Sequence, residues 1–210
     1  SQSYYDGLAA QYSSTQAQQE LDGLFVDKQS ARLKPEWIRR TSVIPAGQVV
    51  VGVDLASSTS ERADYTTMVA VVNGRGTQHV LDAERHKLSF HSSMEEILQF
   101  AKRNRARQII VERTQYQSAA VAELQRMVRG TGIAVRGVSP QGSKLMRFLP
   151  LESRIESGAI TFSPSLPSYY IDELLDFTGF KDPHEDMVDA TVYACEHGVA
   201  CSGGFIEVEY

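Results

Sequence analysis

Three groups of carboxylates stand where they could bind a metal ion together. Asp54 follows the apolar run VVVGV, Glu112 follows the apolar run IIV, and Asp186 and Asp189 lie in the segment HEDMVDA. An ionised carboxylate at the end of an apolar strand is costly unless another charge compensates it. If these acids converge, their mutual repulsion favours hard cations between them, and Mg²⁺ or Mn²⁺ is the natural choice.

Carboxylates with divalent cations of this kind hydrolyse phosphodiesters. Two ions roughly 3.5 to 4 Å apart activate a water and stabilise the leaving oxygen. The sequence therefore predicts a nuclease with two ions in its site. Each group also has a purely structural interpretation: Asp54 could cap a turn, Glu112 could pair with Arg113, and acids in the first turn of a helix favour its dipole.

Helical geometry separates the acids of the last group. Asp186 and Asp189 are three residues apart and share one face of the predicted helix, whereas Glu185 points about 100° away from Asp186. Val188 and Val192 mark the flank that packs inward. We therefore expect Asp186 to be the direct ligand, Asp189 to bind a second ion or hold its waters, and Glu185 to lie at the rim.

The elements that position these acids form an α/β pattern. Three β-branched runs with short connections, between residues 48 and 88, predict an antiparallel meander. Two helix–strand units follow, with a helix opening at Ser92 and with the strands RQIIVE and IAVRGV. Because crossover helices join parallel strands, we expect one mixed five-stranded sheet flanked by helices.

The rest of the chain is predicted to be mostly helical. Helices are expected in residues 142–157, interrupted at Pro150, and around residues 168–178 and 185–197, with a short strand or turn at 159–162. Residues 1–46, which include a helical pattern at 15–24, form an appendage or linker before a domain at 47–197. Residues 198–210 form a tail, whose FIEVEY sequence is a possible strand.

Composition limits the surface that could bind nucleic acid. The 210 residues carry a net charge of -5, so any DNA-binding surface must be a local basic patch. Lys144 and Arg147, which follow the fifth strand, are the preferred phosphate contacts; Arg103, Arg105 and Arg107 are expected at the opposite end of the sheet. The sequence has neither a membrane-length apolar run nor a signal peptide, which indicates a cytosolic protein.

The acidic segments also resemble a known family. GVDLASSTSERADYTTMVAVV, IIVERTQYQ and HEDMVDATVYA resemble, in this order, the three acidic motifs of the C-terminal nuclease domain in the large terminases of tailed bacteriophages. LESRIESGAITF and LLDFTGF are similar to the segment before the last motif. AQQELDGLFVD is similar to the linker after the ATPase domain, so the resemblance covers almost the whole chain.

The resemblance implies an RNase H-like endonuclease that cleaves concatemeric double-stranded viral DNA during packaging, in the cytoplasm of the infected bacterium. By motif, Asp54, Glu112 and Asp186 become the catalytic metal ligands, with Asp189 as a supporting ligand. The family often has Asp-Asp where this chain has Glu185–Asp186, so these two residues remain alternatives for the direct ligand. The implied partners are DNA, the portal, the small terminase subunit and an ATPase domain, with oligomers only in the assembled motor.

Two other functions remain open at this stage. The first is a Holliday-junction resolvase or a transposase-like enzyme, which share the RNase H-like fold. The second is a non-catalytic module that docks on a portal. ATP hydrolysis is not expected, because the nearest approach to a GxxxxGK[ST] loop, Gly137–Lys144, has its lysine one position late and lacks the following Ser or Thr.

Overall fold

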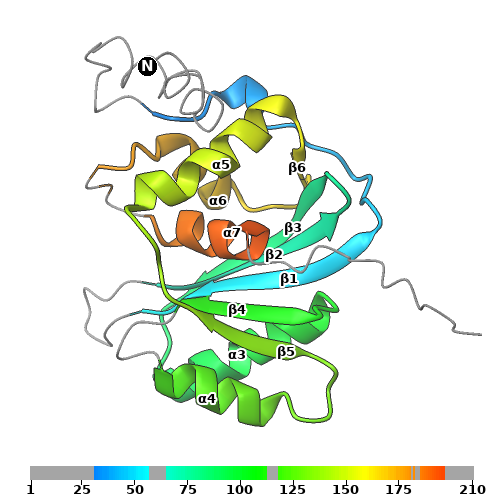
Figure 1. The fold of residues 1–210 in the computed structure, drawn as a ribbon, viewed down its shortest axis with the longest axis vertical. Coiled ribbons are helices and arrows are strands. Elements are labelled where there is room, and N and C mark those ends of the chain that lie inside the picture. The colour runs from blue at the N-terminus through cyan, green and yellow to red at the C-terminus, as the bar shows by residue number, and fades with distance from the viewer. Residues whose placement is uncertain (1–30, 57–64, 113–117, 181, 183–184, 197–210) are drawn as a thin grey trace, which may run out of the picture.

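A mixed sheet forms the centre of the protein, with its strands in the order β5-β4-β1-β2-β3-β6 (Figure 1). The computed structural model describes residues 31–56, 65–112, 118–180, 182 and 185–196. The strands are β1 (Gly47–Asp54), β2 (Thr66–Gly74), β3 (Gln78–His86), β4 (Gln108–Glu112), β5 (Ala134–Val138) and β6 (Ile160–Phe162). β1 to β3 are an antiparallel meander, β4 and β5 run parallel to β1, and β6 runs parallel to β3.

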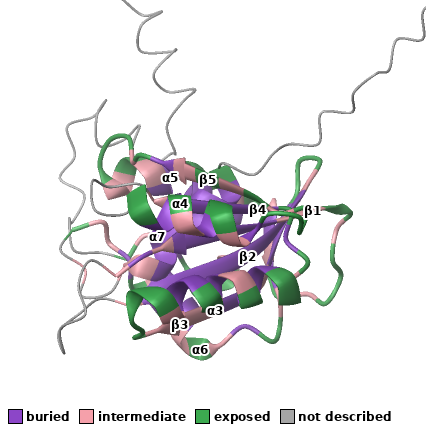
Figure 2. Cartoon of the chain, turned by 90° about the horizontal axis from the view of Figure 1, so that it is seen from below, coloured by how far each residue is buried: buried purple, intermediate pink, exposed green. Residues whose placement is uncertain are grey.

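Helices cover both faces of this sheet (Figure 1). They are the 3₁₀ turn η1 (Pro35–Trp37) and the α-helices α3 (Phe90–Arg103), α4 (Ser118–Met127), α5 (Lys144–Ser157), α6 (Ser168–Asp176) and α7 (Asp186–Glu196). Alternate residues of the central strands face opposite layers: Val51 and Val53 pack with the apolar stripes of α3 and α4, whereas Val69 and Val71 pack with those of α5, α6 and α7. The central strands are accordingly buried on both faces (Figure 2).

The predicted α/β architecture is confirmed, with one strand more than expected. The segment at 159–162, predicted as a strand or a turn, supplies β6, which pairs with the edge of β3 through Gln78, His79 and Val80. A second difference is the start of α3. This helix begins at Phe90 rather than Ser92, because the Ser89 side chain accepts a hydrogen bond from the Ser92 amide and caps it.

The predicted interruption at Pro150 is wrong. Helix α5 continues through this residue, from its Ser143 cap to Gly158. A proline inside a helix costs about 3 kcal/mol. Each large apolar side chain that becomes fully buried contributes about 1.5 to 3 kcal/mol, and α5 buries several of them, including Phe148, Leu151 and Ile155. Packing against the sheet and α7 therefore outweighs the local preference.

Residues 31–46, in the segment predicted as linker, contact the sheet domain. Leu33 is buried in the core, and Arg32 binds Glu152 of α5 with an N–O distance of 2.9 Å. The Arg32 amide also donates to the Phe177 carbonyl. The predicted helix at 15–24 and the FIEVEY tail lie outside the described residues. Within the described part, no helix is long and apolar enough to cross a membrane.

Gly52, in the middle of β1, allows α7 to lie directly on the sheet. A Cβ atom at this position would stand 1.9 Å from the Ala190 carbonyl oxygen and 2.7 Å from the Ala194 amide nitrogen. No side chain fits in such a space, and the obstructing atoms belong to helix backbone that cannot simply rotate away. The glycine in the VVVGVD run thus brings α7 next to the strand that ends in Asp54.

We expect the Gly52→Ala substitution to lower the free energy of unfolding by about 1 to 3 kcal/mol, because α7 must move off the sheet. Urea denaturation followed by circular dichroism measures this change. Ala134→Val provides the control, since it adds apolar atoms at an exposed position of β5. Equal stabilities for both variants would contradict the packing described for Gly52.

Candidate metal centre

Two carboxylates meet at the edge of the sheet where β1 and β4 end. The two strands are parallel neighbours, and Val53 is paired with Val111. The next residues, Asp54 and Glu112, therefore end adjacent strands at the same edge. Both residues are partly exposed there, directly after buried residues of their strands. This register brings the two acids to one edge, and their role as metal ligands stays a prediction.

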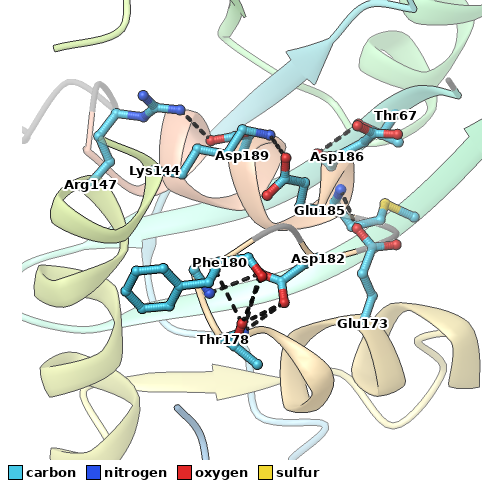
Figure 3. A network of polar contacts seen from close by, with 12 residues as sticks. Thr67, Lys144, Arg147, Glu173, Thr178, Phe180, Asp182, Glu185, Asp186 and Asp189 are labelled. Atoms are coloured by element: carbon cyan, nitrogen blue, oxygen red, sulfur yellow. Dashed lines mark hydrogen bonds and ion pairs between the residues drawn. The ribbon is translucent and has the colours of Figure 1, made fainter. Parts of the chain in front are cut away.

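Helix α7 adds the acids of the last motif. It begins at Asp186, and its position on the sheet is fixed by contacts at its first turn (Figure 3). The Thr67 hydroxyl of β2 donates to the Asp186 carbonyl oxygen at 3.0 Å. The Met187 amide donates to a Glu173 carboxylate oxygen of α6 at 2.7 Å. Glu173 thus satisfies a free amide at the start of α7, as a capping side chain does.

The turn before α7 is held by a second carboxylate. Asp182 accepts hydrogen bonds from the Thr178 and Gly179 amides and from the Thr178 hydroxyl, which lies 2.7 Å away (Figure 3). Gly179 has φ +82° and packs against Leu145 of α5, where a Cβ atom would have little space. This turn therefore joins the end of α6 to the first turn of α5, close to where Lys144 begins that helix.

The pKa of Asp54 is affected by burial and by the neighbouring charges. Burial raises the pKa of Asp54 well above its ordinary value, and the negative charges of Glu112, Asp189 and Asp186 raise it further. The Lys144 ammonium acts in the opposite direction. The carboxylates of β4 and α7 thus act on Asp54 together, in agreement with the convergence of the acids considered in the sequence analysis.

Two cations of α5 are bound to Asp189. The Lys144 ammonium lies 2.7 Å from Asp189 Oδ2 and 2.7 Å from Glu185 Oε1, and Arg147 donates to Asp189 Oδ1 at 2.7 Å (Figure 3). Although burial lowers the pKa of Lys144, the two carboxylates raise it above its ordinary value. Asp189 is buried, whereas Glu185 and Asp186 are both partly exposed. Because one ammonium contacts Glu185 and Asp189, Glu185 lies on the same side of α7 as Asp189, which the helix-face argument from the sequence did not predict.

The donor set fits hard divalent cations, because it consists of carboxylate oxygens whose charges repel one another. In the described part of the chain, a different group of possible metal ligands has its donor atoms within 4.8 Å of one another. This group consists of Glu84, His86 and Glu96. There, however, Glu84 is already bound to Arg103 and to His86. The acids of β1, β4 and α7 stay the metal ligands predicted from the sequence, and here too protein cations, Lys144 and Arg147, are bound to one of the acids.

Comparison with known proteins identifies the family. Residues 51–197 match the model of the terminase RNase H-like domain. The chain belongs to this family. The match includes Asp54, Glu112, Asp186 and Asp189, and it agrees with the resemblance drawn from the three acidic motifs. A search of curated protein sequences found no match.

Solved terminase structures share the fold. The large terminase of the thermophilic bacteriophage D6E superposes with a TM-score of 0.61 at 14% identity, covering 92% of this chain and 51% of that protein. The human cytomegalovirus terminase nuclease domain, soaked with Mn and inhibitor-bound, superposes with a TM-score of 0.59 at 16% identity, covering 78% of this chain and 93% of that protein. The nuclease domain of the large terminase subunit gp2 of bacterial virus Sf6 superposes with a TM-score of 0.58 at 13% identity, covering 77% of this chain and 96% of that protein.

This terminase domain contains features that the sequence did not reveal. Glu173 was not singled out, because an acid in an amphipathic helix has no sequence signal for capping another helix. The ion pairs of Lys144 and Arg147 were also missed, since both residues were expected to face DNA. Asp64 and His184, two further residues near the motifs, lie outside the described residues.

Glu173 of the terminase domain should position α7 rather than bind metal. Its pKa is raised to about 7, first by burial, while the Met187 amide and Arg85 act against this and Asp186 adds to it. We expect Glu173→Ala to lower the free energy of unfolding by about 1 to 2 kcal/mol through loss of the cap and to weaken Mn²⁺ binding by about 10-fold. Calorimetry measures both, and Asp172→Ala, at the exposed neighbouring position, should change neither.

The Glu173→Gln variant tests the same contact through pH. It keeps an oxygen that accepts from Met187 but cannot ionise. Because the folded-state pKa is raised, the wild type loses stability as pH rises from about 4.5 to about 7. The melting temperature of Glu173→Gln minus that of the wild type should therefore increase as the pH rises across this interval. A constant difference would show that Glu173 is not a buried acid of this kind.

Proposed function

We propose that this chain is a metal-dependent endonuclease that cleaves double-stranded DNA, the concatemeric viral genome, during phage packaging. The observation that carries the proposal is the convergence of carboxylates from β1, β4 and α7 around Asp54. Membership of the terminase family supports it, as do the structural neighbours whose titles name nuclease domains. The cytomegalovirus neighbour was soaked with Mn, which agrees with the choice of cation.

Asp54, Glu112 and Asp186 would hold two Mg²⁺ or Mn²⁺ ions, which supply Lewis acidity and activate water for attack on phosphorus. Asp54 and Glu112 are fixed by the sheet, and Asp186 by the first turn of α7. Asp189 would act as a further ligand or orient water. The contacts of Thr67 and Glu173 with the α7 backbone would hold this helix in place while water attacks phosphorus and the bond between phosphorus and the leaving oxygen breaks.

Lys144 and Arg147 are proposed to contact phosphates once the acids have bound cations. In the structure Lys144 is bound to Asp189 and Glu185, and Arg147 is bound to Asp189. A divalent cation on the same carboxylate would weaken these ion pairs through repulsion between like charges. The two side chains, already directed at the site, would then face the backbone of the DNA that enters it.

The setting of this activity follows from the family. The chain spans about half the length of the D6E large terminase. We propose that it works beside an ATPase domain, with the portal and the small terminase subunit as partners, in the cytoplasm of the infected bacterium. ATP hydrolysis by this chain is not expected.

Plasmid cleavage tests the proposal directly. The purified chain should cut supercoiled plasmid with Mg²⁺ or Mn²⁺ and should be inactive in EDTA. Asp54→Ala and Glu112→Ala should each abolish cutting while the melting temperature without metal is not lowered, because removing either acid relieves repulsion. Cutting by either folded variant at the wild-type rate would remove the site assignment, and a wild type that never cuts would favour a docking module.

The acids of α7 should differ in their importance. Asp186→Asn should leave little activity and weak Mn²⁺ binding, Asp189→Asn should be intermediate, and Glu185→Gln should be closest to the wild type. This order is the one expected from the sequence. In the structure the Lys144 ammonium contacts both Glu185 and Asp189, so these two side chains lie on the same side of α7 and Glu185 remains the alternative ligand. Cleavage rates and Mn²⁺ titrations measure the order. A Glu185→Gln protein more impaired than Asp186→Asn would reverse the assignment of the ligand.

A further inference from the structure

Positive charge is separated from negative charge around the β5 edge of the sheet. Residues 97–111 and 124–151 contain no Asp or Glu, although the chain as a whole is acidic. The first stretch includes the end of α3 and most of β4, and the second includes β5 and the first half of α5. Apart from Arg126, which is paired with Glu123 just outside the second stretch, the cations in these stretches have no acid close by in the sequence.

Three of these cations line a pocket at the end of the sheet where β4 and β5 begin. Lys102, Arg105 and Arg107 surround a volume of about 350 Å³, which is closed by the turn Thr131–Ile133. Their side chains are exposed, and none has an ion-pair partner within the described part of the chain. Arg103, which was grouped with them from the sequence, instead faces away and binds Glu84 at 2.7 Å.

Arg136 lies between this pocket and the carboxylates along the strand direction, but on the sheet face of Ile110, whereas Arg107, two residues before Ile109, is on the opposite face. It is exposed at the middle of β5, which is an edge strand of the sheet. Arg136 is paired with Ile110, and Val138 with Glu112, so Arg136 shares the sheet face of Glu112 two residues back along the strand. The described residues hold no carboxylate in ion-pair contact with it.

We propose that the β5 edge of the sheet is a binding surface for the backbone of duplex DNA, running from the carboxylates over Arg136 on one side of this edge strand to the pocket of Lys102, Arg105 and Arg107 on the other. This rests on the proposed function, which supplies the duplex. From Arg107 to Glu112 the strand extends roughly 17 Å at 3.3 Å per residue. This length matches about five base pairs at 3.4 Å each.

Charge accounting favours this surface over Lys144 and Arg147 as the main source of DNA affinity. Affinity for a polyanion comes from cations that release counterions from DNA, and a cation already paired with a carboxylate adds little. Lys144 and Arg147 are both paired with Asp189. Arg107 and Arg136 are free of such pairs among the described residues, so they can contribute in full.

The double variant Arg107→Ala/Arg136→Ala tests the surface. Binding of a 20-base-pair duplex, about four times the proposed span, is measured in EDTA by fluorescence anisotropy at increasing salt. We expect weaker binding and a plot of log affinity against log salt whose slope is smaller by about 1.8, or 0.9 per lost contact. Arg107→Lys/Arg136→Lys should keep most of the slope, which separates charge from folding.

Arg40→Ala/Arg75→Ala is the matched control. It removes the same charge from exposed positions beside β6 and in the β2–β3 turn, and its slope should equal that of the wild type. Equal salt slopes for the two alanine variants would overturn the proposal. This is also the result expected if the pocket binds an acidic protein segment and not DNA. DNA binding is measured without metal and so does not depend on cleavage. If the chain fails to cut plasmid, the proposed nuclease function is refuted, but the salt slopes still decide whether this surface binds DNA.

Discussion

The contact between Gly52 and the backbone of α7 determines where the carboxylates of the site lie. Because Gly52 has no side chain, Ala190 and its neighbours rest directly on β1. The strand that carries Asp54 and the helix that carries Asp186 and Asp189 are therefore held at the closest distance that two backbones allow. A larger residue would separate them, and a site built from strand and helix together would open.

Bringing the acids together creates a charge problem that α5 partly solves. Burial and neighbouring carboxylates raise the pKa of Asp54, and Lys144 and Arg147 bind Asp189 from the other side. A buried carboxylate that lost both cations would be strongly destabilised. Lys144 and Arg147 thus offset part of the negative charge at Asp189, and divalent ions would compete with them for this carboxylate.

The sequence allowed the strands and the converging acids to be predicted, because both follow from local rules. Apolar runs define strands, and parallel neighbours such as β1 and β4 place their last residues, Asp54 and Glu112, at one edge. Features set by tertiary packing could not be predicted. The continuation of α5 through Pro150 depends on the apolar side chains that it buries, and the pairing of Lys144 with Asp189 depends on where α5 meets α7.

The central claim is that the carboxylates of β1, β4 and α7 form the metal centre. A crystal of the domain soaked in MnCl₂, with anomalous diffraction recorded at the manganese edge, tests it most directly. The account predicts manganese in contact with Asp54, Glu112 and Asp186. Manganese bound only at the surface group of Glu84, His86 and Glu96, with Lys144 still on Asp189, would contradict it.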